Sequence, residues 1–438
     1  MSHEFIVGGL LLLAALFLVI FIRSARKANR GNANGPKADV SPATLNTEAT
    51  INTVVADCDD CDPALFTEFG EGADDHEHSG QLHSHPQWPA DAFGPEPGDL
   101  DPVHKGKDNF RGCKFDPVIA NRTKSLRRPR IVLSNLPTPD ARLVAAMNGI
   151  DIKRLTDVIE KLSGEKPMTV GGKTLTLVTR NSHTNGIDTA LAFVEEQYQA
   201  MGNGITVTRH AYKIRGKTFY NIIAERRGDT NPEKIVVVGA HLDSTAGSPW
   251  GAESRCPGAD DDASGTASVL ELARNIAALP LGYTVRFCHF TGEEQGLWGS
   301  YAYSDKLAKE GADVVAMIEM DMVGYCAKPG NRLDIHDGAN KNGSHDLVVM
   351  FTRNVAAYGI NLNVFDTHNH AVDDRSDHAG FLDHGWKAVL LSEEFTEGDG
   401  FNPNYHTTGD RISACNLPYM VEVNKALLVT TCELAALK

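Results

Sequence analysis

Basic residues are scarce relative to acidic residues in this chain of 438 residues. Lys and Arg number 42 against 57 Asp and Glu, so the formal net charge is −15 at pH 7. This excess of negative charge argues against a nucleic-acid partner, because nucleic-acid-binding proteins present basic patches to the phosphate backbone. The imbalance is local: residues 31–110 hold 16 acidic and 3 basic side chains, and the remainder is close to neutral.

Long apolar runs are also absent, apart from one at residues 5–22. This run has 18 residues, and a membrane-spanning helix needs roughly 17–25. A secretory signal peptide carries positive charge before its apolar core. Here the acidic Glu4 precedes the run and basic residues follow it from Arg23 onward. We therefore expect a single transmembrane helix that anchors the chain in a lipid bilayer through residues 5–22.

The chain divides into three segments and shows no internal repeat. Residues 1–30 are the expected anchor and its basic flank. Residues 31–127 are acidic, contain several His residues and lack apolar periodicity, which predicts a disordered stalk of unassigned role. Residues 128–438 alternate in pattern and are expected to form the folded domain. Eight cysteines are spread over the last two segments without a pairing pattern, so they leave the redox compartment and any disulfides open.

The folded segment alternates between strand-like and helix-like patterns. Val-, Ile- and Phe-rich runs predict buried strands at 235–239, 284–290, 313–320 and 387–391. Helical periodicity lies between and around them, for example at 263–279. We therefore predict an α/β fold with an open mixed, mainly parallel sheet and helices on both faces.

Polar residues suited to metal binding follow the ends of these strands. In such sheets, ligands bind outside the carboxyl ends of the strands. Two imidazoles together with several carboxylates are what hard to borderline divalent cations require. The candidates are His241, Asp243, Asp261, Glu293, Glu294, Asp321 and His406.

These residues lie in five motifs that resemble, in order and spacing, those of the co-catalytic di-zinc aminopeptidases typified by bacterial leucyl aminopeptidase. The resemblance spans roughly residues 148–438 and implies a zinc-exopeptidase-like fold. The motifs are His241-Leu242-Asp243-Ser244, the run at 258–265, Glu293-Glu294, Met320-Asp321-Met322 and His406-Thr407-Thr408.

The resemblance implies two Zn²⁺ ions and assigns their ligands. His241 and Asp321 complete one zinc site. Glu294 and His406 complete the other, and Asp261 bridges the two. The residues alone do not choose Asp261 over its two acidic neighbours, which are equally well explained as caps of the helix that follows.

The resemblance also implies catalytic roles. Glu293 matches the general base that takes a proton from a metal-bridging water and delivers it to the leaving amine. Asp243 follows His241 by two residues, and we expect it to accept the second ring N–H of that imidazole. The bacterial enzyme stabilises its oxyanion with a tyrosine in a loop that carries two cysteines. This chain has neither the cysteines nor the tyrosine there, and Tyr405 is a candidate on proximity alone.

We therefore expect a membrane-anchored metallo-aminopeptidase that acts on the N-termini of peptides or proteins. The alternatives are another di-zinc amide hydrolase, a carboxypeptidase of the same fold, a glutaminyl-cyclase-like acyltransferase and a non-catalytic peptide-binding ectodomain. The basic flank favours a cytoplasmic catalytic domain, whereas the family resemblance favours an extracytoplasmic one. The sequence leaves open the first-residue specificity, the oligomeric state and the physiological metal.

Overall fold

The computed structural model describes residues 136–327, 329–367, 375–394 and 400–438. The expected anchor and stalk lie outside these residues, as does the predicted domain boundary near residue 128. No helix of the described part of the chain is long and apolar enough to cross a membrane.

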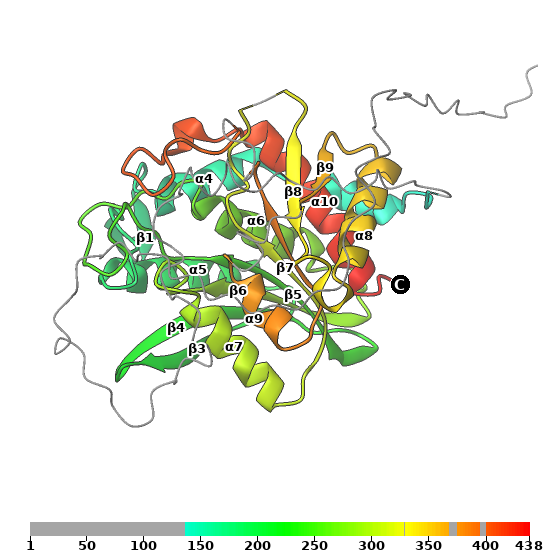
Figure 1. Cartoon of the computed structure of the whole chain (residues 1–438), viewed down its shortest axis with the longest axis horizontal. Coiled ribbons are helices and arrows are strands. Elements are labelled where there is room, and N and C mark those ends of the chain that lie inside the picture. Colours follow the sequence, from blue (N-terminus) through cyan, green and yellow to red (C-terminus); the bar gives the residue numbers. More distant parts are fainter. Residues whose placement is uncertain (1–135, 328, 368–374, 395–399) are drawn as a thin grey trace, which may run out of the picture. The chain divides into compact units, whose positions relative to one another are not determined.

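A mixed sheet of eight strands forms the centre of the described domain (Figure 1). Four neighbouring pairs are parallel and three are antiparallel, with the four central strands all parallel. The predicted mixed sheet is thereby confirmed. In spatial order the strands are β3 (Ile205–Ile214), β4 (Lys217–Arg226), β6 (Tyr283–Phe290), β5 (Asn231–His241), β7 (Asp313–Met320), β10 (Ala388–Ser392), β8 (Arg332–His336) and β9 (Asn363–Asp366).

Helices cover both faces of this sheet, as predicted. A separate two-stranded antiparallel sheet joins β1 (Met168–Val170) to β2 (Lys173–Leu175), and two short 3₁₀ turns are η2 (Lys341–Gly343) and η3 (Ile412–Ala414). The helices are α3 (Ala141–Met147), α4 (Ile152–Leu162), α5 (Gly186–Met201), α6 (Ala263–Ile276), α7 (Trp298–Lys309), α8 (His345–Ala357), α9 (His378–Asp383) and α10 (Leu417–Leu434).

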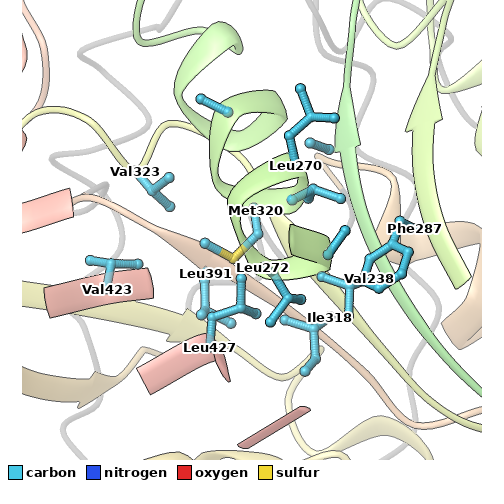
Figure 2. Packing of buried hydrophobic residues seen from close by; sticks show 14 of the residues in the cluster. Val238, Leu270, Leu272, Phe287, Ile318, Met320, Val323, Leu391, Val423 and Leu427 are labelled. Carbon is cyan, nitrogen blue, oxygen red and sulfur yellow. The ribbon is translucent and has the colours of Figure 1, made fainter. Parts of the chain in front are cut away.

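The alternation of side chains along the strands divides the core into two layers. On β5, Val236 and Val238 face the larger layer, which also receives residues of α3, α4, α5, α6, α8 and α10. Ile235 and Val237 face the smaller layer beneath α7 and α9. Figure 2 shows the larger layer, where side chains of α6 and α10 meet those of the central strands. Each fully buried aliphatic side chain contributes about 1.5–3 kcal/mol of transfer free energy, so this layer sets the position of α6 against the sheet.

The direction of the strands determines which loops can meet. The carboxyl ends of β5, β6, β7 and β10 lie together at one end of the sheet, because these strands are parallel. Strand β8 runs antiparallel to β10, and β9 runs parallel to β8. The carboxyl ends of β8 and β9 therefore lie at the opposite end of the sheet.

Candidate metal centre

The predicted ligands converge at the carboxyl end of the central strands. His241 is the last residue of β5, and Asp321 follows β7 directly. Glu294 lies in the loop between β6 and α7, whereas Asp261 immediately precedes the residue that caps α6. His406 comes from the loop between β10 and α10. Five segments far apart in the chain thus deliver side chains to one place.

Asp261 lies between two clusters of ligand atoms. Its Oδ1 atom is 2.9 Å from Nε2 of His241, and its Oδ2 atom is 3.1 Å from Nε2 of His406. The His241 Nε2 atom also lies 3.5 Å from Oδ1 of Asp321, and the His406 Nε2 atom lies 3.0 Å from Oε2 of Glu294. A carboxylate whose two oxygens face two different imidazoles has the arrangement that a bridging ligand of two cations needs.

The charges at this centre fit divalent cations. Burial lowers the pKa of His406, but Glu294 and Asp261 outweigh burial and raise this pKa to about 10. Burial raises the pKa of Glu294 to about 7, and the charge of Asp261 adds to the effect while His406 opposes it. Without metal, protons balance the buried carboxylates. Because ligands bind metal in their deprotonated forms, a divalent cation would displace these protons and supply the same positive charge.

Glu293 lies beside this centre. Its carboxylate can approach His241 and Glu294 so that one ligand atom of each lies within 4.8 Å of the others. Its pKa is raised well above the ordinary value by burial and by the charges of Glu294 and Asp321, against the opposing effect of His241. Its backbone N–H donates to Oδ1 of Asp243 at 3.3 Å, which ties the Glu293 loop to the segment that follows β5.

The expected contact of the Asp243 carboxylate with His241 is wrong in detail. The His241 Nδ1–H donates to the backbone carbonyl of Asp243 at 3.1 Å, whereas the nearest carboxylate oxygen is 3.8 Å away. The chain turns after β5 so that the carbonyl, not the side chain, lies against the ring. The tautomer is still held by an acceptor, and the Asp243 carboxylate instead orients the backbone that carries Glu293.

Of the two neighbours of Asp261, Asp262 caps α6, as the capping alternative anticipated, whereas Asp260 hydrogen-bonds to other segments. Asp262 is the N-cap of α6 and accepts hydrogen bonds from the backbone N–H of Gly265 (2.9 Å) and His241 (3.1 Å). Asp260 accepts hydrogen bonds from Gly324 N–H (2.8 Å) and the Asn402 amide (2.9 Å). The peptide bond between residues 261 and 262 is cis. The side chains of Asp260 and Asp262 thus hydrogen-bond to protein groups around the centre.

Arg180 is a positioning residue that the sequence analysis missed. It is fully buried, and its guanidinium donates to the carbonyls of Leu242 (2.8 Å) and Gly258 (2.6 Å). These carbonyls belong to the two segments that carry His241 and Asp261. Only its place in a polar run before α5 marks Arg180 in the sequence, and such runs are common in loops. The five acceptors of this arginine are all backbone carbonyls, which no sequence motif reveals.

Two further groups of side chains surround the centre. Asp377 and His378 are fully buried at the start of α9 and belong to none of the ligand clusters in the described ranges, consistent with a supporting role. The Tyr405 ring stacks on the His406 ring with centroids 3.7 Å apart, so Tyr405 is adjacent to the centre. Its role at an oxyanion stays a prediction.

Comparison with known proteins identifies relatives of this chain. A probable zinc metalloprotease of Pyricularia oryzae is 31% identical over 209 residues, which cover 45% of this chain and 40% of the relative. Leucine aminopeptidase 1 of Trichophyton rubrum is 31% identical over 256 residues, which cover 56% of this chain and 66% of that protein. The chain thus spans from 40% to 69% of the length of the first curated relatives it matches.

Solved structures share the fold. The LapA aminopeptidase of Legionella pneumophila superposes with a TM-score of 0.55 at 20% identity, covering 70% of this chain and 78% of that one. Glutaminyl cyclases share the fold as well, so the fold alone does not choose the reaction. Residues 221–431 match the model described as peptidase family M28, and this stretch contains every predicted ligand. This match over residues 221–431 places that part of the chain in peptidase family M28 and confirms the resemblance carried by its five motifs.

Proposed function

We propose that this protein is a zinc-dependent aminopeptidase that removes N-terminal residues from peptides. The observation that carries the proposal is the position of Asp261, whose two carboxylate oxygens face two separate imidazoles. His241 and Asp321 would hold one zinc ion, and Glu294 and His406 the other. Bound zinc would supply Lewis acidity, which polarises a scissile carbonyl and lowers the pKa of a water.

Glu293 would move the proton in this reaction. It lies beside both ligand clusters and is not itself needed to complete either one. Burial raises its affinity for a proton, so its carboxylate can accept a proton from the attacking water and pass it to the departing amine. The hydrogen bond from its backbone N–H to Asp243 holds the Glu293 loop against the segment that follows β5.

The charge of the centre favours a substrate amine over a substrate carboxylate. The carboxylates of Glu293, Glu294 and the partly exposed Asp321 can accept hydrogen bonds from a substrate amine, whereas in their ionised form they cannot donate to a substrate carboxylate. A carboxypeptidase needs a cation for the C-terminal carboxylate. Arg180 lies near Asp261 and Asp262, but it is fully buried and donates to backbone carbonyls. It is therefore not available to receive a substrate.

The experiment is hydrolysis of a panel of aminoacyl anilides by the full chain loaded with zinc. We expect cleavage that stops when a chelator removes the metal and that fails on N-acetylated versions of the same substrates. Dependence of the rate on the first residue would define the specificity. Cleavage that persists after acetylation of the substrates would contradict an aminopeptidase.

Two other outcomes would identify the alternatives. Cyclisation of an N-terminal glutaminyl peptide with release of ammonia would indicate a glutaminyl cyclase. Release of C-terminal residues from N-blocked peptides would indicate a carboxypeptidase. Zinc binding without turnover of any of these substrates would favour a peptide-binding module.

The membrane anchor is a separate proposal that rests on residues 5–22 alone. Fractionation of cells that express the full chain and a variant that lacks residues 5–22 would test it. The full chain is expected in the membrane fraction, and protease accessibility of the catalytic domain in intact cells would show on which side it lies. Recovery of the full chain in the soluble fraction would contradict the anchor.

A further inference from the structure

A second group of metal-ligating side chains lies at the opposite end of the sheet from the candidate centre. Asp337 directly follows β8, Asp366 is the last residue of β9, and His345 is the first residue of α8. One ligand atom of each lies within 4.8 Å of the others. Because β8 and β9 end where β10 begins, this cluster is separated from the first centre by the length of the central strands.

The separations within this cluster are those of ligands around a small cation. The His345 Nδ1 atom lies 3.4 Å from Oδ2 of Asp337 and 3.3 Å from Oδ2 of Asp366. A direct N–H···O hydrogen bond is shorter, at about 2.7–3.2 Å. For tetrahedral zinc with bonds of about 2.0–2.1 Å to nitrogen and oxygen, neighbouring ligand atoms are about 3.3–3.4 Å apart. The observed distances match the second geometry.

An ordinary ion pair of the same residue types provides the internal comparison. His384 and Asp305 lie on the other face of the sheet, and Nε2 of His384 is 2.7 Å from Oδ1 of Asp305. That separation is a normal hydrogen bond. At the candidate centre, the separations between imidazole nitrogens and carboxylate oxygens range from 2.9 to 3.5 Å. The separations of 3.3 and 3.4 Å in the Asp337–His345–Asp366 cluster are longer than that of the ion pair and lie at the upper end of the range at the candidate centre.

A short chain of hydrogen bonds links the Asp337 side chain to the backbone of His345. The Oδ1 atom of Asp337 accepts the backbone N–H of Asn340 at 2.9 Å. The Oδ1 atom of Asn340 in turn accepts the backbone N–H of His345 at 3.1 Å. These bonds leave Oδ2 of Asp337 directed towards the His345 ring. Hydrogen bonds that fix ligands from behind are typical of protein metal sites.

Burial and charge indicate the class of ion. The side chain of Asp337 is fully buried and that of Asp366 is 8% exposed, so two carboxylates meet where solvent screens little of their repulsion. A divalent cation bound between the two carboxylates would reduce this repulsion. The imidazole nitrogen in the set favours a first-row transition metal ion over Ca²⁺ or Mg²⁺, which prefer oxygen ligands.

We propose that Asp337, His345 and Asp366 form an additional binding site for a divalent transition-metal ion such as Zn²⁺. The ion would join the carboxyl ends of β8 and β9 to the start of α8, so it would brace the side of the sheet beyond β10. The site does not depend on the proposed peptidase reaction, because it lies at the other end of the sheet.

The test is the zinc content of the full chain, measured by elemental mass spectrometry after dialysis against zinc-free buffer. The variants are His345→Ala and the more conservative Asp366→Asn. Each is expected to hold one zinc ion fewer per chain than the wild type. The matched control is His384→Ala, which breaks the ordinary ion pair and should keep the wild-type zinc content.

The outcomes separate this site from the proposed function. His406→Ala should lose zinc at the first centre while still losing one further ion when combined with Asp366→Asn. A wild-type zinc content in both His345→Ala and Asp366→Asn would overturn the proposal, even if stability falls, because that result describes an ion pair. If His345→Ala does not fold, Asp366→Asn decides alone. Absence of zinc from the first centre would contradict the proposed function and leave the expected one-ion difference at this site intact.

Discussion

The two ends of the sheet carry clusters built from the same residue types in different settings. At the carboxyl end of β5, β6 and β7, the side chain of His241 is 1% exposed, and the two carboxylate oxygens of Asp261 face two imidazoles. At the other end, the side chain of His345 is 26% exposed and faces two carboxylates. Glu293 lies beside the first centre. Among the residues that the structure describes, no further carboxylate belongs to the second cluster. Of the two proposed cation sites, only the first therefore has a neighbouring carboxylate to which we assign proton transfer.

The largest effect on turnover is expected when Glu293, the proposed proton carrier of the first centre, is replaced. Glu293→Gln should lower turnover of aminoacyl anilides by about 10²–10⁴-fold, because the amide cannot accept the proton of the attacking water. Its zinc content should stay at the wild-type value, since Glu293 completes neither ligand cluster. Anilide hydrolysis and zinc content measured on the same sample check this. Glu310→Gln, which removes a surface charge paired with Lys306, is the control and should leave both unchanged. Undiminished turnover in Glu293→Gln would exclude the assigned role.

The next effect distinguishes the two clusters by activity. His406→Ala should lose one zinc ion and most activity, because Asp261 and Glu294 lose the imidazole that completes their site. Asp366→Asn should also lose one zinc ion but keep its turnover, since it changes the opposite end of the sheet. Zinc content and hydrolysis rates of the two variants make the comparison. Equal loss of activity in both would show that the clusters are coupled.

The third prediction concerns the free energy of unfolding, to which the hydrogen bonds of Arg180 contribute. Arg180→Met leaves several buried carbonyls without their donor and should lower the free energy of unfolding by about 3 kcal/mol or more. Arg209→Met, which breaks an ion pair with Glu195 near the surface, should change it by less than about 1 kcal/mol. Denaturant unfolding of both variants measures the difference. A similar small loss in both would show that Arg180 does not hold the two segments together.

The smallest effect concerns the stabilisation provided by zinc at the second cluster. An ion present at 100 times its dissociation constant stabilises the folded chain by about 2.7 kcal/mol. The increase in unfolding temperature on zinc addition should therefore be smaller in His345→Ala than in the wild type. His384→Ala should respond to zinc as the wild type does. An identical zinc response in all three proteins would contradict the bracing role of the second ion.

The sequence predicted the fold best where patterns are long and local. Strand β5 and helix α6 were recognised from an unbroken apolar run and from helical periodicity, and their observed bounds differ from the prediction mainly at the ends. The short elements β8, β9 and α9 were missed, because four to six residues do not establish a period. Strand β8 takes its place in the sheet by pairing with β10, and β9 by pairing with β8, and both pairings are long-range contacts.

The same distinction applies to the site. The seven predicted residues follow strand ends in motifs with recognisable spacing, and the structure brings them together. The contact between Asp243 and His241 was wrong, because a turn of the backbone decides whether a carbonyl or a carboxylate reaches the ring. Arg180 was missed because its partners are backbone carbonyls.

By itself, the sequence determined the alternation of strands and helices, the candidate ligands of the first centre and the family resemblance. Each of these depends on residue type and on spacing along the chain. Only the tertiary structure decided that Asp261 lies between two imidazoles and that Asp337, His345 and Asp366 meet at the opposite end of the sheet. The physical reason is strand direction: β8 turns back against β10, and this antiparallel pairing gathers residues that no local pattern connects.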